Sequence, residues 1–442
     1  MFKEETKNAM KYAHEELWSR FINKKEGALY DFADLNGTAI LPTADECKKA
    51  MPNAMGWSTP TEDGPFYNGF YLDALCNRHL IENTFASAEQ TRLIARGLLK
   101  FAIEDGKKGF ITRGFSDDGT AFYTASSDDQ VFPWFYGLWR YLKSSIPTVE
   151  ETITITRIMT NVATALKENA WRIPCHDPAF GYRGSFARSR IEDITRLLFI
   201  LRAMYDITAN SYWIEAYNRH INTDDYVYYL TNVEICAKGS DYDFYDGKMV
   251  FFPFKPDFYK SEAFSYETIR IEQALPFFTT SMVQVALRAL IEMEQSAEIN
   301  VYYQKGLKLS AVPAASHIVR YQGFDNDNNL PFLCNWRFLN EYWKPQNNIK
   351  DTHHAANAQL LEWYKKSPRS PYENNYVREP LFAAWITALS NNDDLITKYF
   401  ADIEGILNHY HWSKLYTSTF FVAECVYYQL EKNKIQKEKY KV

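Results

Sequence analysis

Cysteine is scarce in this sequence, and the motifs that usually mark metal or nucleotide sites are missing. Six cysteines are scattered over 442 residues without a Cys-x-x-Cys pair, which argues against a zinc site or a disulfide framework and favours buried free thiols. Neither His353-His354 nor His409-Tyr410-His411 has the spacing that would place two rings on one helix face for a metal. No glycine-rich dinucleotide loop, Walker A sequence or Gly-x-Ser-x-Gly elbow occurs. We therefore expect no metal and no cofactor.

The sequence also lacks long apolar runs and any excess of positive charge. No run of apolar residues is long enough to cross a bilayer, and the charged start, Met1 to Glu5, leads into an amphipathic helix rather than a signal peptide. The net charge of −6 argues against a nucleic-acid partner. We expect a soluble protein that binds neither membranes nor nucleic acid. It would be cytoplasmic, or periplasmic or secreted if an export signal has been removed.

Aromatic residues, in contrast, are abundant. Hydrophobic residues make up 46% of the chain and charged residues 24%, which is enough for a large core. Aromatic residues alone make up 16%, and their rings suit both cores and surfaces that meet flat ligands. No stretch rich in proline, glycine, serine or charge resembles a linker, so we predict one domain over residues 1–442.

The spacing of apolar residues predicts helices from end to end. A polar, aromatic loop repeatedly precedes a helix that is apolar on most sides, and a more amphipathic helix follows. A helix apolar all round is buried, and its amphipathic neighbour covers it. The clearest strand signal is a hairpin over residues 242–254 with Asp246-Gly247 at its turn. The apolar helices are expected to start near Tyr67, Gln130, Ile191, Ile269, Val377 and Leu415.

Six such helix pairs imply an inner ring of helices inside an outer ring. The first three loop starts, near 66, 128 and 190, are 62 residues apart in each step, which is room for two helices and two loops. This arrangement resembles the six-hairpin, or (α/α)6-toroid, glycosidase superfamily, which includes the unsaturated glucuronyl hydrolases. The resemblance covers nearly the whole chain as a pattern of elements. It implies an all-α toroid with a small β-hairpin insertion, and a carbohydrate cleft at one end of the ring.

Carboxylates open most of these helices, and helices of one hand bring their N-terminal loops to one mouth of a ring. Glycoside cleavage requires one carboxylic acid to protonate the leaving oxygen and a second carboxylate as base or nucleophile. The alternative is that each acid caps its helix or complements its dipole. The candidates are Glu62, Asp63, Asp117, Asp118, Asp128, Asp129, Glu192, Asp193, Glu272 and Glu379.

Two acid doublets stand out among these residues. Asp128-Asp129 runs directly into Val131-Phe132-Pro133-Trp134, and carboxylates beside aromatic walls can have raised pKa values. In the unsaturated glucuronyl hydrolases, acids at the starts of the second and third inner helices do the chemistry. By position, the resemblance therefore implies Asp129 as general acid and Asp193 as its partner, with Asp128 and Glu192 as substitutes.

Arginines and aromatic residues surround the expected mouth. The arginines could bind a substrate carboxylate bidentately, which indicates a uronic acid, or they could pair with neighbouring acids and hold the loops. Aromatic rings at helix starts could stack on sugars. The predicted substrate-binding residues are Trp57, Asp63, Tyr67, Trp134, Tyr182, Arg183, Arg188, Arg190, Glu272, Trp336, Arg378 and Trp412.

Together these patterns predict a glycoside hydrolase that acts on a glycan fragment, in which an oligosaccharide or polysaccharide is the partner. Two alternatives stay open. The same toroid could carry a polysaccharide lyase or sugar epimerase, where Tyr or His takes the proton. A glycan-binding protein could also retain the cleft without catalysis. The sequence carries no signal for the oligomeric state.

Overall fold

The computed structural model describes residues 2–223, 230–240 and 277–439. These residues are mostly helical, as predicted, with two short antiparallel hairpins. The chain divides into two compact units, unit 1 (residues 1–186, 319–381 and 400–442) and unit 2 (residues 187–318 and 382–399). Both units are discontinuous in sequence, so the division does not separate two consecutive domains, and a single domain over 1–442 stays a prediction. The expected hairpin at 242–254 and Glu272 lie outside the described residues.

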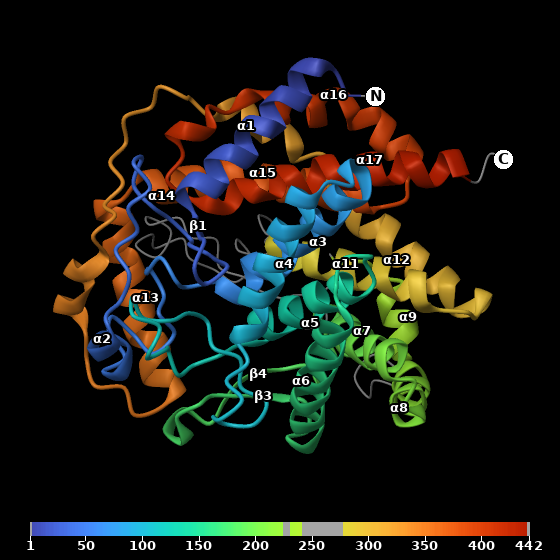
Figure 1. Ribbon diagram of the computed structural model, residues 1–442, viewed down its shortest axis with the longest axis horizontal. Helices are drawn as coiled ribbons and strands as arrows, with labels where there is room; N and C mark the ends of the chain where they lie inside the picture. Colours follow the sequence, from blue (N-terminus) through green and yellow to red (C-terminus); the bar gives the residue numbers. More distant parts are fainter. Residues whose placement is uncertain (1, 224–229, 241–276, 440–442) are drawn as a thin grey trace, which may run out of the picture. The chain divides into compact units, whose positions relative to one another are not determined.

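Unit 1 is built around α3 (Gly64–Glu82), which is buried along most of its length. It packs against α5 (Asp128–Leu142), α4 (Phe85–Lys100) and α17 (Phe421–Lys439) (Figure 1). Pro65 suits the first turn because its fixed φ matches the helix and its missing N–H is not needed there. Asn83 in the left-handed conformation ends the helix. α3 is therefore a buried helix with well-defined ends.

The helices that cover α3 and α5 bury one face only. α4 and α6 (Val149–Glu168) each begin with a capping box, from Thr84 to Ser87 and from Thr148 to Glu151. α1 (Glu4–Arg20) begins where the sequence predicts and packs against α17. The other helices that lie wholly or partly in unit 1 are α2 (Ala44–Lys48), α13 (Ile349–Lys366), α14 (Arg369–Glu373), a π-helical turn (Asn374–Arg378), α15 (Glu379–Leu389) and α16 (Asp393–His409).

Unit 2 repeats the pairing of a buried helix with a covering helix. α7 (Ile191–Thr208) and α11 (Phe277–Met293) pack against each other and are buried on nearly all sides. α8 (Ser211–Ile221) covers α7, α12 (Ala297–Ala315) covers α11, and the short α9 (Asn232–Cys236) contacts α7 and α12. The predicted sequence of apolar and amphipathic helices is thus confirmed for these described pairs.

The predicted helix starts hold for four helices and shift for the last. α3, α5, α7 and α15 begin at Gly64, Asp128, Ile191 and Glu379, close to their expected positions. α17 begins at Phe421 rather than near Leu415, because two 3₁₀ turns, Trp412–Lys414 and Ser418–Phe420, flank an extended Leu415. The start expected near Ile269 lies outside the described residues.

The two hairpins that the structure describes were not predicted. β1 (Ile22–Asn23) pairs with β2 (Ala28–Leu29), and β3 (Arg172–Pro174) pairs with β4 (Tyr182–Ser185). Strands of two to four residues are too short to show an alternating pattern in the sequence. β4 carries Tyr182 and Arg183, two of the predicted substrate-binding residues.

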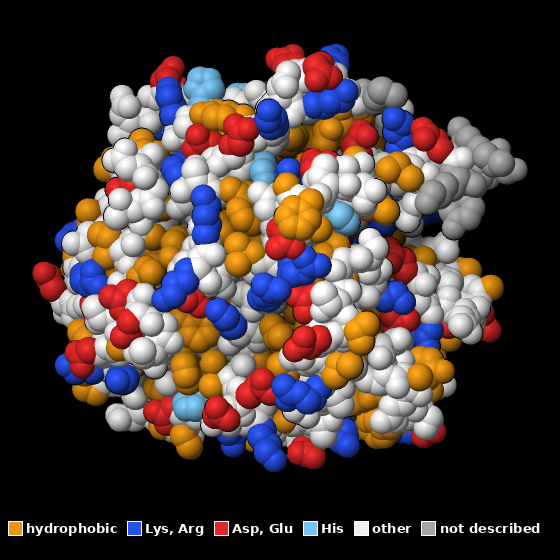
Figure 2. Space-filling model, viewed as in Figure 1, with side chains coloured by type: hydrophobic (Ala, Val, Ile, Leu, Met, Phe, Trp, Pro, Cys, Tyr) orange, Lys and Arg blue, Asp and Glu red, His pale blue; other side chains and the backbone are white. Residues whose placement is uncertain are grey.

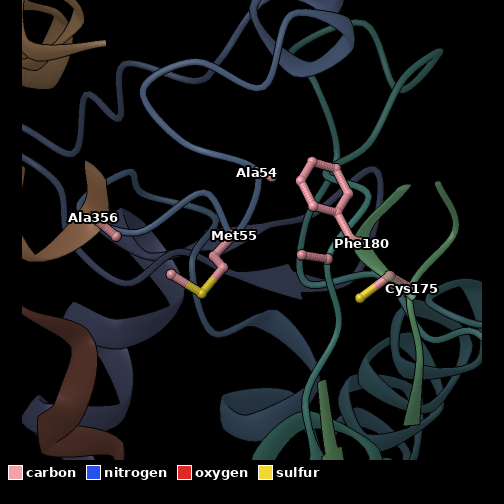
Figure 3. Close-up of a cluster of buried hydrophobic side chains, with 6 residues drawn as sticks. Ala54, Met55, Cys175, Phe180 and Ala356 are labelled. Atoms are coloured by element: carbon pink, nitrogen blue, oxygen red, sulfur yellow. The ribbon is translucent and has the colours of Figure 1, made fainter. Parts of the chain in front are cut away.

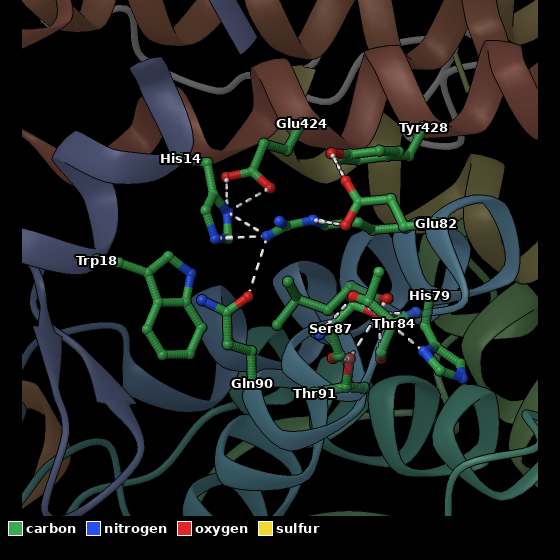
Figure 4. A network of polar contacts seen from close by, with 12 residues as sticks. His14, Trp18, His79, Glu82, Thr84, Ser87, Gln90, Thr91, Glu424 and Tyr428 are labelled. Atoms are coloured by element: carbon green, nitrogen blue, oxygen red, sulfur yellow. Dashed lines mark hydrogen bonds and ion pairs between the residues drawn. The ribbon is translucent and has the colours of Figure 1, made fainter. Parts of the chain in front are cut away.

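A buried polar network ties α1, α3 and α17 together (Figure 4). His14 of α1 lies 3.1 Å from the Glu424 carboxylate of α17, and the Tyr71 hydroxyl of α3 donates to Glu424 at 3.1 Å. Trp18 of α1 donates to the Tyr71 hydroxyl at 2.8 Å. Buried polar groups of this kind require partners, so the network fixes how these three helices pack.

The six cysteines are free thiols, as expected, and all but Cys334 are buried. Burial raises the pKa of the Cys76 thiol to about 12, which keeps it unreactive. Within the described ranges, no helix is both long enough and apolar enough to cross a membrane.

The close approach of α3 and α5 depends on glycine. A Cβ atom added at Gly69 would lie 2.2 Å from the carbonyl oxygen of Pro133, and one at Gly137 would lie 2.6 Å from the carbonyl oxygen of Gly69. Both obstacles are backbone atoms, so relief requires a shift of a whole helix.

We therefore expect Gly69→Ala to lower the free energy of unfolding by roughly 1–3 kcal/mol, because the added methyl overpacks this contact. Urea unfolding of the two proteins would measure the change. Alanine normally stabilises a helix interior by up to about 1 kcal/mol relative to glycine, so a gain in stability would show that the helices do not meet here.

Candidate functional site

The guanidinium group of Arg113 joins the starts of α3 and α5. Its side chain is 1% exposed. It donates to the Glu62 carbonyl at 2.9 Å, to the Asp63 carboxylate at 2.6 Å and to the Ser127 hydroxyl at 2.7 Å. Its Nη1 also lies 3.8 Å from the Asp129 carboxylate. Two helix starts that are far apart in sequence therefore share one buried cation.

Asp63 does not cap α3 with its side chain, contrary to the capping alternative. Its carboxylate, 26% exposed, also accepts a hydrogen bond from the Gln130 amide at 2.8 Å. The Asp63 backbone N–H donates instead to the buried Asp31 carboxyl at 2.7 Å. The side chain of Asp63 is thus free of the helix end and belongs to the group around Arg113.

Asp31, Glu62, Asp63 and Asp129, with Arg113, form what we call the acid cluster. Burial and the nearby Asp63 raise the pKa of Glu62 to about 8. Burial, with the neighbouring carboxyl groups, also raises the pKa of Asp31 well above its ordinary value, and that of Asp63 is raised mainly by burial. Like charges at short range cannot all ionise, so the cluster retains protons at neutral pH, with Glu62 among the protonated groups.

Asp129 has a different environment from Glu62. The Ser127 hydroxyl donates to its carboxylate, the Arg113 guanidinium is nearby, and 30% of the side chain is exposed. Such donors stabilise an ionised carboxylate. The side chain of the neighbouring Asp128 lies against Gly184 of β4 instead. A Cβ atom added to that glycine would lie only 2.5 Å from the Asp128 carboxyl oxygen. Only Asp129 of this doublet therefore belongs to the acid cluster.

Arg183, Trp57 and His353 lie together beside the acid cluster. The Arg183 guanidinium lies 5.6 Å from the Trp57 ring centre and donates to the Ser126 carbonyl at 3.0 Å. Trp57 and His353 meet edge to face at 6.0 Å. Arg183 makes no ion pair with a carboxylate among the described residues, and its Nε and the Trp57 Nε1 are buried without a hydrogen-bond partner there. Unsatisfied buried donors of this kind suit an acceptor supplied by a ligand.

Burial and neighbouring positive charge lower the pKa values of both Arg183 and His353. Burial and the nearby Arg113 lower the pKa of Arg183. Burial, followed by Arg183 and Arg113, lowers the pKa of His353 to about 4. The imidazole is therefore neutral at physiological pH.

A small apolar cluster supports the loops that carry these residues (Figure 3). Met55, Phe180 and Ala356 pack with three other buried side chains, and Trp57 packs against the group. Met55 and Trp57 share one loop, Phe180 precedes β4, and Ala356 follows His353 on α13. One core thus positions Trp57, Arg183 and His353.

Arg378 reaches the same region from the π-helical turn. Its guanidinium pairs with Glu379 at 2.9 Å. Its positive charge also acts to lower the pKa values of Asp63, Tyr67 and Tyr364, against the larger effect of burial. Tyr67 itself is 7% exposed. Single π turns inside helices occur often at functional sites, and this one places a cation beside the acid cluster.

The buried pair Arg369 and Glu373 holds the chain before that turn. Their side chains lie 2.9 Å apart and are 2% and 0% exposed. Glu373 also accepts hydrogen bonds from the backbone and the hydroxyl of Thr417. The turn that carries Arg378 is thereby tied to the segment that precedes α17.

Four of the predicted site residues lie in unit 2 and pair among themselves: Arg188, Arg190, Glu192 and Asp193. Arg188 binds the Asp193 carboxylate at 2.8 and 3.1 Å, and Arg190 contacts Glu192. Asp193 is 0% exposed and Glu192 is 3% exposed. Arg188 and Arg190 therefore pair with neighbouring acids, which is the second of the two roles considered for the arginines from the sequence. Since Asp129 belongs to unit 1 and Asp193 to unit 2, the separation of their carboxyl groups stays a prediction.

Three of the expected sugar platforms are core residues. Trp134 is 0% exposed and donates to the Leu98 carbonyl, and Trp336 is 0% exposed and donates to the Ile40 carbonyl. Trp412 is 1% exposed. None of these rings offers a face to a ligand. Tyr182 is half-buried, but the Arg172 guanidinium covers its ring at 4.3 Å.

Sequence reasoning gave no role to Asp31 and His353. Asp31 lies between Tyr30 and Phe32, far from any helix start, and His353 is inside α13. Glu62 was among the candidate acids, but nothing in the sequence showed that its surroundings raise its pKa. In the described part of the chain, no group of three His, Cys, Asp or Glu side chains could hold a metal ion.

Comparisons with protein-family models, curated proteins and solved structures found no match to this chain.

The raised pKa of Glu62 predicts a pH-dependent loss of stability. Below about pH 4.5, its ordinary pKa, the group is protonated in both the folded and the unfolded chain. Between about pH 4.5 and 8 only the unfolded chain loses the proton, so stability falls as pH rises, by at most about 1.4 kcal/mol per pH unit for this proton.

Glu62→Gln should therefore gain stability over the wild type as pH rises from about 4.5 to 8, and the two should converge at lower pH. Urea unfolding at several pH values would show this divergence. Parallel curves across the window would mean that Glu62 is ionised in the folded protein.

Proposed function

We propose that this chain is a glycoside hydrolase whose chemistry is done at the acid cluster. The observation that carries the proposal is Glu62, a carboxyl group with a pKa of about 8, close to Asp63 and Asp129, whose carboxyl groups lie next to the Arg113 guanidinium. Glycoside cleavage requires such a division between a protonated and an ionised carboxyl group. The pairs of buried and covering helices support the further proposal that α3, α5, α7, α11, α15 and α17 form the inner ring of an (α/α)6 toroid.

In this mechanism Glu62 gives its proton to the glycosidic oxygen as the bond to the anomeric carbon breaks. Asp129 supplies the carboxylate that the second half of the reaction needs, either toward water or toward the anomeric carbon. Arg113 places a positive charge beside the Asp129 carboxyl group. The assignment differs from the expected pair, since Glu62 takes the role of acid and Asp129 that of carboxylate, and Asp193 is held by Arg188.

Glu62→Gln and Asp129→Asn should each reduce turnover by roughly 10²-fold or more, because each removes one half of the acid–base pair. Asp128→Asn is the matched control, since Asp128 lies against Gly184, and it should cost much less. Turnover of oligosaccharides, followed by mass spectrometry, would measure the three variants. Equal losses for Asp128→Asn and Asp129→Asn would contradict the assignment.

The pH profile gives an independent check of the acid. Activity should fall as pH rises through about 8, because Glu62 then loses the proton that it donates. Asp128→Asn should show the same fall in activity as pH rises through about 8.

Arg183 supports a substrate that carries a uronic acid. Its side chain is half-buried beside an aromatic ring, its Nε is buried without a hydrogen-bond partner, and it makes no ion pair with a carboxylate among the described residues. A planar carboxylate would satisfy its unpaired N–H donor.

Arg183→Lys should therefore weaken turnover of a uronate-containing oligosaccharide about tenfold more than that of its neutral counterpart, since lysine keeps the charge and loses the fork. The comparison requires kcat/KM for the two substrates. Arg188→Lys is the control, since Arg188 already binds Asp193. An equal loss on both substrates would assign Arg183 to loop structure.

The neutral His353 favours a polysaccharide lyase as the second candidate. A lyase removes the proton next to a uronate carboxylate, and an unprotonated imidazole near Arg183 could accept it. The product of that reaction contains a new double bond, so ultraviolet absorbance separates the two functions. Absorbance that grows during the reaction and disappears in His353→Ala would replace the hydrolase proposal.

A further inference from the structure

A cavity of about 320 Å³ lies in unit 1 next to the acid cluster and shares only the side chain of Arg113 with it. Arg113, Thr61 and Gly64 form part of its wall, whereas none of the four carboxyl groups of the acid cluster lines it. Its volume is at the lower end of the range for small-molecule sites. The proposed reaction does not use this space.

The wall of the cavity is largely aromatic and aliphatic. Phe101, at the end of α4, stacks on Phe115 at 5.4 Å and 25°, and both rings line the cavity together with Tyr30 and Leu29. Phe101 and Leu29 are each 1% exposed, whereas Phe115 is half-buried. Over the region of β1 and α4, Figure 2 shows hydrophobic side chains that reach the surface beside basic ones.

The polar side chains that line the cavity balance in charge, apart from Arg113, which is bound to Asp63. Lys100 lies 2.8 Å from the Glu26 carboxylate and Lys25 lies 3.7 Å from it. The exposed Asp117 supplies a second carboxylate. Two ammonium and two carboxylate groups give no net attraction for a charged ligand, but they provide donors and acceptors in equal measure.

Aromatic faces combined with mixed donors and acceptors match the chemistry of a neutral sugar. The C–H face of a sugar ring packs on an aromatic ring, while its hydroxyl groups both donate and accept hydrogen bonds. We infer that this cavity is a second, non-catalytic binding site for a neutral sugar unit of mono- or disaccharide size. The inference does not depend on the proposed hydrolysis.

This position has a consequence for long substrates. The cavity and the acid cluster share the segment around Gly64 and the side chain of Arg113. A glycan bound at the cavity would remain near the acid cluster, which raises the effective concentration of its other units there.

Binding of neutral disaccharides to the full chain, measured by titration calorimetry and saturation-transfer NMR, tests the inference. We expect Phe115→Ala to weaken binding about tenfold, because it removes one aromatic face. Phe85→Ala is the matched control, since that ring is 82% exposed and does not line the cavity, and it should bind as the wild type does. Lys25→Ala removes an exposed donor, should fold normally and should weaken binding less.

Glu62→Gln separates this site from the acid cluster, since it should reduce turnover by roughly 10²-fold or more and leave disaccharide binding unchanged. If turnover is absent in the wild type but Phe115→Ala still weakens binding, the proposed hydrolase fails and the sugar site stands. The inference is overturned if no neutral disaccharide binds at millimolar concentration, if glucuronate binds more tightly than its neutral counterpart, or if Phe115→Ala and Lys25→Ala both bind like the wild type.

Discussion

The ion pair between Arg113 and Asp63 is the interaction on which the rest of the site depends. A buried guanidinium is costly unless carboxylates and other acceptors surround it, and here those acceptors are the starts of α3 and α5. The same charge lies beside only some of the carboxyl groups. Asp63 and Asp129 lie next to the cation, whereas Glu62 offers it only a backbone carbonyl, and burial with the nearby Asp63 raises the pKa of Glu62 to about 8.

Placing several carboxyl groups together opposes folding, and the surrounding backbone offsets part of that cost. The Ser58 N–H donates to the Glu62 carboxyl at 2.7 Å, and the Asp63 N–H donates to Asp31. These donors come from the chain that leads into α3, so the loop and the carboxyl groups stabilise each other. Active sites often retain such destabilising groups because function requires them.

The sequence was a good guide to the helices and a poor one to the contacts of side chains. Apolar periodicity located α3, α5 and α7 because burial on all sides leaves a plain signal. It placed the start of α17 too early because Leu415 is apolar, like the residues of the helix, but lies in the extended segment before it. The same holds for the candidate site, where some residues could be chosen from the sequence and others could not. Asp129 and Arg183 could be chosen from their loops, but Asp31 became visible only through a contact with a residue 32 positions away.

The two sides of the site differ in charge, and that difference constrains what could bind. Around Asp63 several carboxyl groups lie close together and offer an anion no attraction, while the half-buried Arg183 carries a positive charge without an ion pair to a carboxylate among the described residues. A ligand with negative charge at one end and only hydroxyl groups at the other would satisfy both sides. The lowered pKa of His353 fits this division, because a second cation beside Arg183 is thereby avoided. Recognition of charge and chemistry on the bond to be cleaved are thus separate tasks in the proposed site, and different loops supply them.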